Sequence, residues 1–234
     1  MRMRKKKNGE QRLASCKEFV IEKPDLSVGE GDVWLEIGAG KGGFACGMTA
    51  KYPSVRYFAM ERVTDCVVLA AEKAKRFAEE NGSCTNLKYI IDTADNLTNL
   101  FDNESVDAIF LNFSDPWSKK GYAKRRLTHK RYLAVYLNLL KDGGTLTFKT
   151  DNVGLFDFSL EQIEDIGLKC EVLTRDLHAS EYADDNVVTE YEAAFALQGM
   201  KINMLRIRKP EGFNIEIPVD LARGAKKSYH FDQE

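Results

Sequence analysis

The stretch Asp32-Val-Trp-Leu-Glu-Ile-Gly-Ala-Gly-Lys-Gly-Gly43 decides the fold of this chain. Its first half is a short apolar run, which predicts a buried strand, and the run ends in a glycine-rich turn. Apolar runs and helical patterns then alternate along the chain. Strands that alternate with helices predict an α/β fold with a doubly wound, mainly parallel sheet.

The remaining elements are read from the same patterns. We expect further strands over 55–60, 87–91, 106–111 and 145–148, and helices over 65–80, over 128–140 and after Asp151-Asn152. Residues 169–175 and 202–208 alternate enough to be late strands. The expected sheet has seven strands, with one antiparallel strand near the C-terminus.

The composition is that of an ordinary globular protein. The chain has 234 residues, 44% of them hydrophobic and 30% charged, with a net charge of -2. Its five widely spaced cysteines predict neither a disulfide framework nor a zinc site, so we expect no metal and a cytoplasmic location. No apolar run is long enough for a membrane span. We divide the chain into a basic, partly flexible N-terminal segment (1–30), one domain (31–209) and a C-terminal extension (210–234) of unknown role.

The glycine loop allows two interpretations. Gly38-Ala-Gly-Lys-Gly-Gly43 satisfies the dinucleotide-binding pattern, and it also fits the first motif of S-adenosylmethionine (SAM) methyltransferases. Glu36 favours SAM, because a carboxylate repels a pyrophosphate but suits the amino group of a methionine. Glu61, 25 residues further on, is placed to accept hydrogen bonds from a ribose. The expected cofactor is therefore SAM, bound by Glu36, Gly38, Gly40 and Glu61.

Polar residues also follow the third strand, in Ile91-Asp-Thr-Ala-Asp-Asn96. Asp92, Thr93 and Asp95 are candidates for contacts to the adenine of the cofactor. They are equally candidates for capping the next helix, because Asp and Thr satisfy free backbone N–H groups there. One residue could serve both purposes.

The fourth strand ends in Asn112-Phe-Ser-Asp-Pro-Trp117, where substrates meet cofactors in open α/β sheets. Seven Lys or Arg residues follow between Lys119 and Arg131, with no Asp or Glu among them. Such a block predicts a surface for a polyanion. Trp117 could stack on a base or simply pack under the loop.

These segments, with Phe148-Lys-Thr-Asp151 and Thr189-Glu-Tyr-Glu192, resemble the bacterial tRNA (guanine-N7-)-methyltransferase family over residues 32 to 208. The resemblance implies a Rossmann-like class I SAM methyltransferase that methylates a guanine in the tRNA variable loop, at conventional position 46. Its partner would be tRNA, and the enzyme a monomer or homodimer.

Carried over by position, the resemblance implies four roles for named residues. It implies that Asp115 is catalytic and also lies on the cofactor side. It further implies cofactor contacts by Glu36, Glu61 and Thr93, substrate contacts by Lys119, Asp151, Thr189, Glu190, Tyr191 and Glu192, and RNA contacts by Lys124, Arg125, Arg126 and His129. The family usually has aspartate where Thr93 stands, so the adenine contact could come from Asp92 or Thr93.

Two features keep other interpretations open. Thr189 and Glu192 also form a capping-box pattern, in which Glu192 is structural and Thr189 or Glu190 faces the substrate. His129 fits an RNA-facing or helix-start residue.

Guanine N7 carries a lone pair and no proton, so Asp115 is expected to orient guanine or stabilise charge, without acting as a base. The alternatives are a methyltransferase for an exocyclic amine, a catalytically silent tRNA-binding module and an NAD oxidoreductase.

Overall fold

The strand predicted over 32–37 is β2 (Val33–Ile37), the central strand of the computed structural model, which describes residues 6–82 and 84–224. Leu35 and Ile37 face one side of the sheet and Glu36 the other, as the period of two in a strand requires. The chain then turns through Gly38, whose φ of 85° favours glycine, into the next helix.

Among the described residues the sheet has eight strands, in the order β1-β4-β3-β2-β5-β6-β8-β7. Neighbours are parallel except at β8, which is antiparallel to both β6 and β7. The other strands are β1 (Val20–Ile21), β3 (Arg56–Glu61), β4 (Leu87–Ile91), β5 (Val106–Asn112), β6 (Leu140–Thr150), β7 (Val172–Thr174) and β8 (Asn203–Arg208). The predicted fold class and its one antiparallel strand are confirmed. The extra strand, β1, has two residues and therefore no periodicity to detect.

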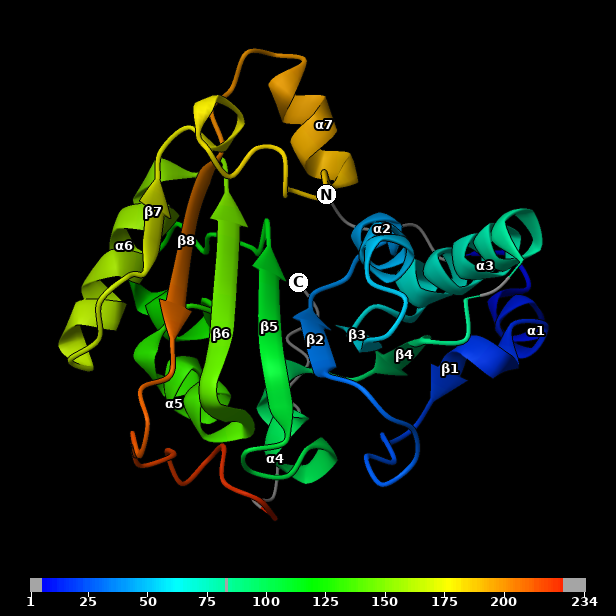
Figure 1. Ribbon diagram of the computed structural model, residues 1–234, viewed down its shortest axis with the longest axis horizontal. Coiled ribbons are helices and arrows are strands. Elements are labelled where there is room, and N and C mark those ends of the chain that lie inside the picture. Colours follow the sequence, from blue (N-terminus) through cyan, green and yellow to red (C-terminus); the bar gives the residue numbers. More distant parts are fainter. Residues whose placement is uncertain (1–5, 83, 225–234) are drawn as a thin grey trace.

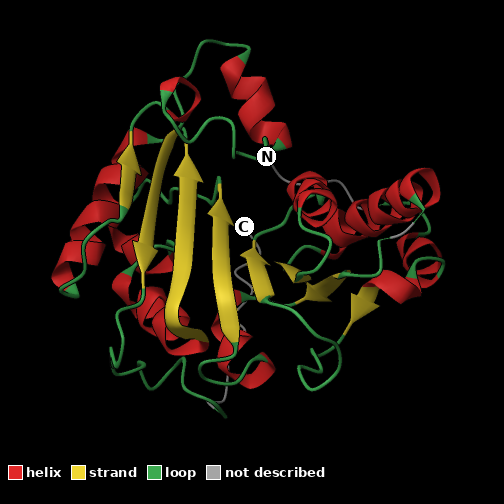
Figure 2. Ribbon diagram, viewed as in Figure 1, coloured by secondary structure: helices red, strands yellow, loops and turns green. Residues whose placement is uncertain are grey.

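Helices cover both faces of the sheet (Figures 1 and 2). One face packs on α4, α5 and α6, and the other on α1, α2 and α3. The α-helices are α1 (Gly9–Ala14), α2 (Gly43–Lys51), α3 (Thr64–Asn81), α4 (Leu97–Leu100), α5 (Lys130–Leu139), α6 (Val153–Asp165) and α7 (Glu190–Ala196). Short 3-10 helices are η1 (Lys17–Phe19), η2 (Ala94–Asn96), η3 (Lys120–Arg125) and η4 (Leu177–Ala179).

The boundary between α5 and β6 differs from the prediction. A helix was expected over 128–140 and a strand from 145, but α5 ends at Leu139 and Leu140 already begins β6. Leu140 is fully buried and pairs with Val106, whereas Thr145 pairs with Ala108. Residues 141–144 therefore form an irregularity in this pairing, where Gly143 has a φ of 77°.

Both terminal segments pack on the domain as far as they are described. In the N-terminal segment, Arg12 forms two hydrogen bonds of 2.7 Å with the Glu72 carboxylate on α3. In the C-terminal extension, Leu221 is buried, and its carbonyl accepts a hydrogen bond of 2.8 Å from the Thr98 hydroxyl. Residues 211–224 are therefore part of the packed domain. Residues 1–5 of the N-terminal segment, which was expected to be partly flexible, lie outside the described residues. The remainder of the extension, 225–234, also lies outside them.

Because the extension packs on the domain, we expect it to contribute measurably to the free energy of unfolding. Leu221→Ala should lower the free energy of unfolding by about 2 to 4 kcal/mol, because it leaves a cavity in the core. Urea denaturation of the purified variant measures this loss. Val219→Ala is the matched control, since Val219 is 83% exposed two residues earlier and should change stability by less than about 0.5 kcal/mol. Equal effects of the two changes would contradict this packing.

Candidate active site

The carboxyl ends of β2 and β5 lie side by side where the strand order reverses. β3 and β4 extend the sheet from β2, and β6 extends it from β5 in the other direction. Ligands of open α/β sheets bind outside the strand ends at such a switch point. Because β2 to β6 are parallel, the residues after each of them meet at one edge, and α7 lies beyond that edge (Figure 1).

Glu36 lies at this switch point with its carboxylate almost without a partner. The residue is only 2% exposed. Among the described residues it accepts hydrogen bonds from Asn112 Nδ2 at 3.3 Å and from the Tyr57 hydroxyl at 3.4 Å, and both distances are long. Burial raises the pKa of Glu36 to about 7, although these two donors and Lys149 oppose the shift. The carboxylate can therefore accept a further, charged donor.

The glycine loop presents an open surface beside Glu36. Gly38 and Gly40 have φ values of 85° and 55°, and a Cβ at either position would meet nothing within 4 Å. Gly42 differs, because a Cβ there would lie 2.3 Å from the Tyr89 hydroxyl. Gly42 therefore serves packing, whereas Gly38 and Gly40 border free space. This arrangement fits a ligand that approaches the backbone closely.

Glu61 connects the end of β3 with the glycine loop. One carboxylate oxygen accepts a hydrogen bond of 3.0 Å from the backbone N–H of Gly40, and the other accepts one of 2.9 Å from Val63 N–H. Each oxygen keeps a second lone pair for a further donor. Glu61 thus holds the loop in place and can still accept a hydroxyl group.

The loop after β4 leaves one side chain available. Asp92 accepts hydrogen bonds from Thr93 N–H at 2.7 Å and from Asn96 Nδ2 at 2.6 Å, so it supports the start of η2. Asp95 accepts one from the Tyr132 hydroxyl at 2.7 Å. The Thr93 hydroxyl is buried and has no partner among the described residues. An unpaired buried hydroxyl is unfavourable, so Thr93 fits a ligand contact better than Asp92.

Asp115 projects from a strained loop after β5. Phe113 and Trp117, on either side of it, have φ values of 51° and 42°, which bulky residues rarely adopt. Arg126 holds the loop by donating hydrogen bonds to the carbonyls of Pro116 at 2.9 Å and Trp117 at 3.1 Å. The Asp115 side chain is 70% exposed and lies 3.6 Å from the Arg62 guanidinium. The carboxylate is thus fixed at the surface of the switch point.

A buried ion pair joins β6 to α7. Lys149 Nζ lies 2.7 Å from a Glu192 carboxylate oxygen, and the two side chains are 3% and 0% exposed. Asn186 Oδ1 and the Val187 carbonyl accept the other hydrogen bonds of Lys149, at 2.9 and 3.0 Å. His178 Nε2 lies 2.8 Å from the second Glu192 oxygen. Burial alone would raise the pKa of Glu192, but these partners hold it below its ordinary value.

The capping box predicted for α7 is present. Thr189 Oγ1 accepts a hydrogen bond of 2.9 Å from Glu192 N–H, and Glu192 accepts one of 3.2 Å from Thr189 N–H. Glu190 forms an ion pair with Lys73 of α3. Tyr191 is 60% exposed. Of the four residues predicted to contact the substrate here, Glu190 and Tyr191 are the exposed ones, and Glu192 has no exposed surface.

Two glycines of α2 allow the segment before α7 to dock. A Cβ at Gly47 would lie 2.7 Å from Val187 Cγ1, and one at Gly43 would lie 3.0 Å from Glu190 Cγ. Gly43 and Gly47 are one helical turn apart and share a face. The glycine loop and α7 are therefore brought together by α2.

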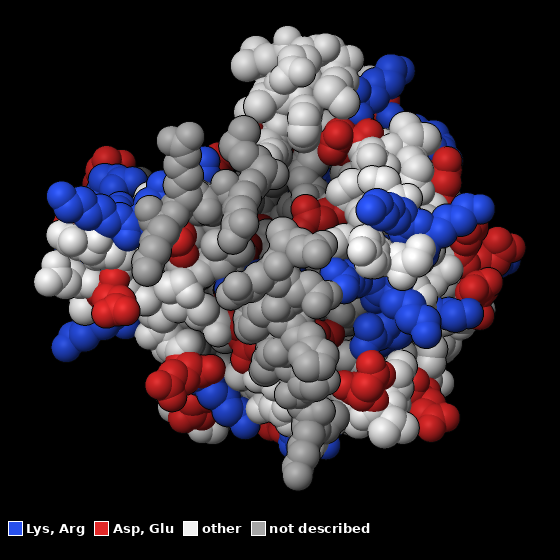
Figure 3. All heavy atoms as spheres, turned by 180° about the vertical axis from the view of Figure 1, so that it is seen from behind, with Lys and Arg blue, Asp and Glu red and all other residues white. Residues whose placement is uncertain are grey.

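The cations of the basic block differ in exposure and in their contacts. Lys119, Lys120, Lys124 and Arg125 are exposed, and Arg125 lies over the rings of Trp117 and Tyr122. Arg126 holds the Asp115 loop, the exposed Lys130 pairs with Asp165, and Arg131 pairs with Asp220. Seen from behind, Lys and Arg side chains gather on the side of α5 and α6 (Figure 3).

His129 begins α5. Its Nδ1 accepts a hydrogen bond of 3.1 Å from Arg131 N–H, as expected of a helix-start residue. Burial, together with four neighbouring cations, lowers the pKa of His129. Asp151, the last predicted substrate residue, follows β6 at the same edge as the ends of β2 and β5 and is half-buried.

Three functional side chains were not assigned from the sequence. Lys149 lies in a quoted motif, and a cation in a buried strand is itself a signal, because charges are rarely buried without a partner. Asn112 was visible as the polar end of an apolar run. Arg62 gave no signal, since its contact with Asp115 joins residues 53 positions apart in the sequence.

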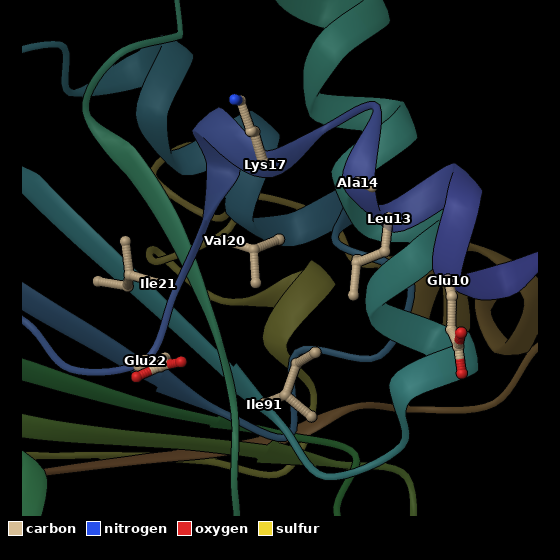
Figure 4. A pocket seen from close by; sticks show the side chains of 8 residues that line it. All are labelled: Glu10, Leu13, Ala14, Lys17, Val20, Ile21, Glu22 and Ile91. Carbon is tan, nitrogen blue, oxygen red and sulfur yellow. The ribbon is translucent and has the colours of Figure 1, made fainter.

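A pocket of about 470 Å³ lies between α1 and the edge of the sheet (Figure 4). Leu13, Val20 and Ile91 form its apolar part, with Glu10 and Lys17 also lining it. Residues that we predict for the active site do not line it. Within 6–82 and 84–224, no cluster of His, Cys, Asp and Glu is placed to hold a metal, and no helix is long and apolar enough to cross a membrane.

Solved structures with a similar fold define the class of protein. One is the 16S rRNA methyltransferase KamB, with a TM-score of 0.59 and 15% identity, covering 81% of this chain and 95% of that one. Another is an antibiotic-related methyltransferase, with a TM-score of 0.55 and 13% identity, covering 88% and 96%. The fold is that of class I SAM-dependent methyltransferases.

Sequence relatives identify the family within this class of methyltransferases. A family model described as "Putative methyltransferase" matches residues 30–205. The tRNA (guanine-N(7)-)-methyltransferase of Streptococcus equi subsp. zooepidemicus is 37% identical over 88% of this chain and 98% of its own length. That of Halalkalibacterium halodurans is 37% identical over 86% and 93%. The chain belongs to the bacterial tRNA (guanine-N7)-methyltransferase family.

The raised pKa of Glu36 predicts a pH-dependent effect on stability. Between its unfolded pKa near 4.5 and its folded pKa of about 7, the folded protein retains a proton that the unfolded chain loses. Stability therefore falls as pH rises through this range, by roughly 3 kcal/mol. Glu36→Gln removes this loss, so the variant should be more stable than the wild type at pH 8 and similar at pH 5, as measured by urea denaturation.

Glu192→Gln is the matched comparison, since Glu192 is equally buried but paired with Lys149. Its lowered pKa contributes stability above the unfolded pKa, which is lost as pH falls. This variant should be less stable than the wild type at pH 8. If both variants shifted stability in the same direction at pH 8, the contrast between the two carboxylates would be wrong.

Proposed function

We propose that this protein transfers the methyl group of SAM to N7 of a guanine in the variable loop of tRNA, at conventional position 46. The names of the relatives support tRNA as the substrate and guanine N7 as the acceptor. The observation that carries the proposal is the switch point, where the almost unpartnered Glu36, the open glycine loop and the exposed Asp115 follow neighbouring strands. A tRNA substrate also implies activity in the cytoplasm.

The residues at the strand ends fit SAM. Glu36 binds the ammonium of the methionine part, because its buried carboxylate lacks a cation of its own. Glu61 accepts the ribose hydroxyls with its remaining lone pairs, and the Thr93 hydroxyl contacts the adenine. Gly38 and Gly40 let the backbone approach the ligand. When bound, SAM supplies an electrophilic methyl group.

The chemistry assigned to Asp115 is electrostatic. Guanine N7 has a free lone pair, so no proton has to be removed before transfer. The purine becomes cationic as the methyl group arrives, and a fixed carboxylate stabilises that charge. The Arg126 hydrogen bonds hold the loop, so Asp115 requires little reorganisation. Glu190 contributes to guanine binding with Asp151, and Thr189 and Glu192 act indirectly by capping and holding α7.

The decisive experiment is to incubate the protein with labelled SAM and unmodified tRNA and to map the modified base. Label at N7 of the variable-loop guanine is the expected result. Label on an exocyclic amine would favour a different nucleic acid methyltransferase, and binding of tRNA without any label would favour a silent binding module.

Asp115→Ala should lower the methyl-transfer rate by about 100-fold or more, because it removes a charge that acts on the developing cation. Affinity for tRNA, measured by filter binding, should change by less than about 2-fold. Asp184→Ala is the control, since Asp184 is an exposed acid in the loop before α7 and should leave the rate unchanged. A rate near that of the wild type would remove Asp115 from the reaction.

The exposed cations of the basic block predict a change in salt dependence. Lys119→Ala combined with Lys124→Ala should weaken tRNA binding and reduce the slope of log affinity against log salt by about 1.5, as two phosphate contacts are lost. Lys169→Ala is the control, because Lys169 is exposed before β7, at the opposite edge of the sheet. An unchanged slope in the double variant would exclude these lysines from the RNA interface.

A further inference from the structure

We infer that Tyr191, supported by Phe113 and Phe195, is the surface on which the target purine stacks, and that it favours the purine in its cationic, methylated form. This inference rests on the proposed function, since it concerns the base that is methylated. It assigns to one exposed aromatic ring a role in positioning the base and in stabilising the charge that develops on it.

The three rings form one platform. The Phe113 and Tyr191 ring centroids are 6.4 Å apart with planes inclined by 26°, and those of Tyr191 and Phe195 are 6.4 Å apart at 29°. Phe113 and Phe195 are 6.0 Å apart at 37°. Phe113 and Phe195 also pack on a buried cluster around Leu177 and Ile202. Tyr191, at 60% exposure, is therefore the outer ring of a supported layer.

The platform lies next to the proposed catalytic carboxylate. Phe113 precedes Asp115 by two residues, so their Cα atoms are at most about 7 Å apart. The left-handed backbone at Phe113, with φ of 51°, is unfavourable for a bulky residue and occurs where surroundings enforce it. Here Phe113 N–H donates a hydrogen bond of 2.9 Å to the Lys149 carbonyl. The strained residue thus places its ring against α7.

Lys149 holds both segments that carry the platform, one through its backbone and the other through its side chain. Its carbonyl holds the backbone of Phe113, and its ammonium holds Glu192, the residue after Tyr191. The capping box further defines the first turn of α7, which carries Tyr191. The position of the exposed ring is therefore set before any ligand binds, and little conformational entropy is lost on stacking.

The chemistry of the base fits such a surface. A purine must leave its tertiary stack to be methylated, which costs a few kcal/mol. Stacking on an aromatic side chain returns about 1–3 kcal/mol per base. Methylation at N7 makes the purine a cation, and the face of an aromatic ring attracts cations. Tyr191 should therefore bind the transition state more strongly than the neutral guanine, which increases the rate.

The first test compares Tyr191→Phe, Tyr191→Leu and Leu197→Ser, the last being a control at the residue directly after α7, which is 90% exposed. Tyr191→Leu should lower kcat/KM for tRNA by about 5- to 150-fold, the equivalent of one lost stack. It should lower the single-turnover rate at saturating tRNA as well, while KM for SAM stays within about 2-fold. Tyr191→Phe and Leu197→Ser should stay within about 2-fold throughout.

The second test uses mononucleotides and does not depend on turnover. The wild type and Tyr191→Phe should bind 7-methylguanosine 5′-monophosphate more tightly than guanosine 5′-monophosphate, as followed by saturation-transfer NMR. Tyr191→Leu should reduce this preference to the part that the Asp115 carboxylate supplies. A merely structural role would not produce a preference that depends on the charge of the base.

The two proposals fail separately. If the wild type methylates guanine N7 in tRNA but Tyr191→Leu retains the rate and the nucleotide preference, the stacking platform is wrong and the proposed function stands. If the wild type places no label on N7, the proposed function is wrong, and the platform stands only where the nucleotide preference is present and is reduced in Tyr191→Leu. Unchanged thermal unfolding of Tyr191→Leu is expected, because the ring is exposed.

Discussion

The buried ion pair between Lys149 and Glu192 is the interaction on which the site depends. It joins the end of β6 to α7 and so holds the first turn that carries Tyr191. The backbone carbonyl of the same Lys149 accepts a hydrogen bond from Phe113, in the loop before Asp115. The ion pair also sets the charge balance of the interior. Around the switch point the buried carboxylates of Glu36, Glu61 and Glu192 outnumber the buried ammonium of Lys149, which lies 2.7 Å from Glu192. Glu192 is neutralised by this partner, whereas Glu36 keeps a raised pKa, and a cationic ligand is what restores the balance.

Sequence patterns anticipated the parts of this arrangement that are local. Apolar runs located the strands, and carboxylates at or just beyond the carboxyl ends of these strands were correctly expected at the shared edge, as with Glu36, Glu61 and Asp115. The capping box of α7 was also confirmed. What the patterns missed depends on contacts between distant residues. The edge strand β1 is too short to show a period, and the packing of Leu221 becomes visible only when α4 lies beneath it.

The basic block illustrates why the number of charged residues in a sequence segment overestimates the size of a binding surface. Seven cations were assigned to one patch, yet three of them serve the fold: Arg126 clamps the Asp115 loop, and Lys130 and Arg131 pair with acids remote in sequence. A guanidinium that donates to two carbonyls fixes a strained turn more firmly than water could. The same segment therefore holds the loop of Asp115, the proposed catalytic residue, and presents other cations beside it. In the proposed function this couples placement of the RNA backbone to placement of the reacting base.

Glu36 and Glu61 differ in the hydrogen bonds that their carboxylates accept. Glu61 receives two backbone N–H groups and so holds the glycine loop whether or not a ligand is bound. Glu36 receives only long hydrogen bonds from Asn112 and Tyr57, and its charge is therefore costly in the folded protein. A ligand ammonium that pairs with Glu36 binds the folded state alone, and so stabilises it by mass action. If Glu36 binds the cofactor as proposed, cofactor binding and the stability of the sheet centre are linked through one carboxylate, and the link is strongest above pH 7, where Glu36 is ionised.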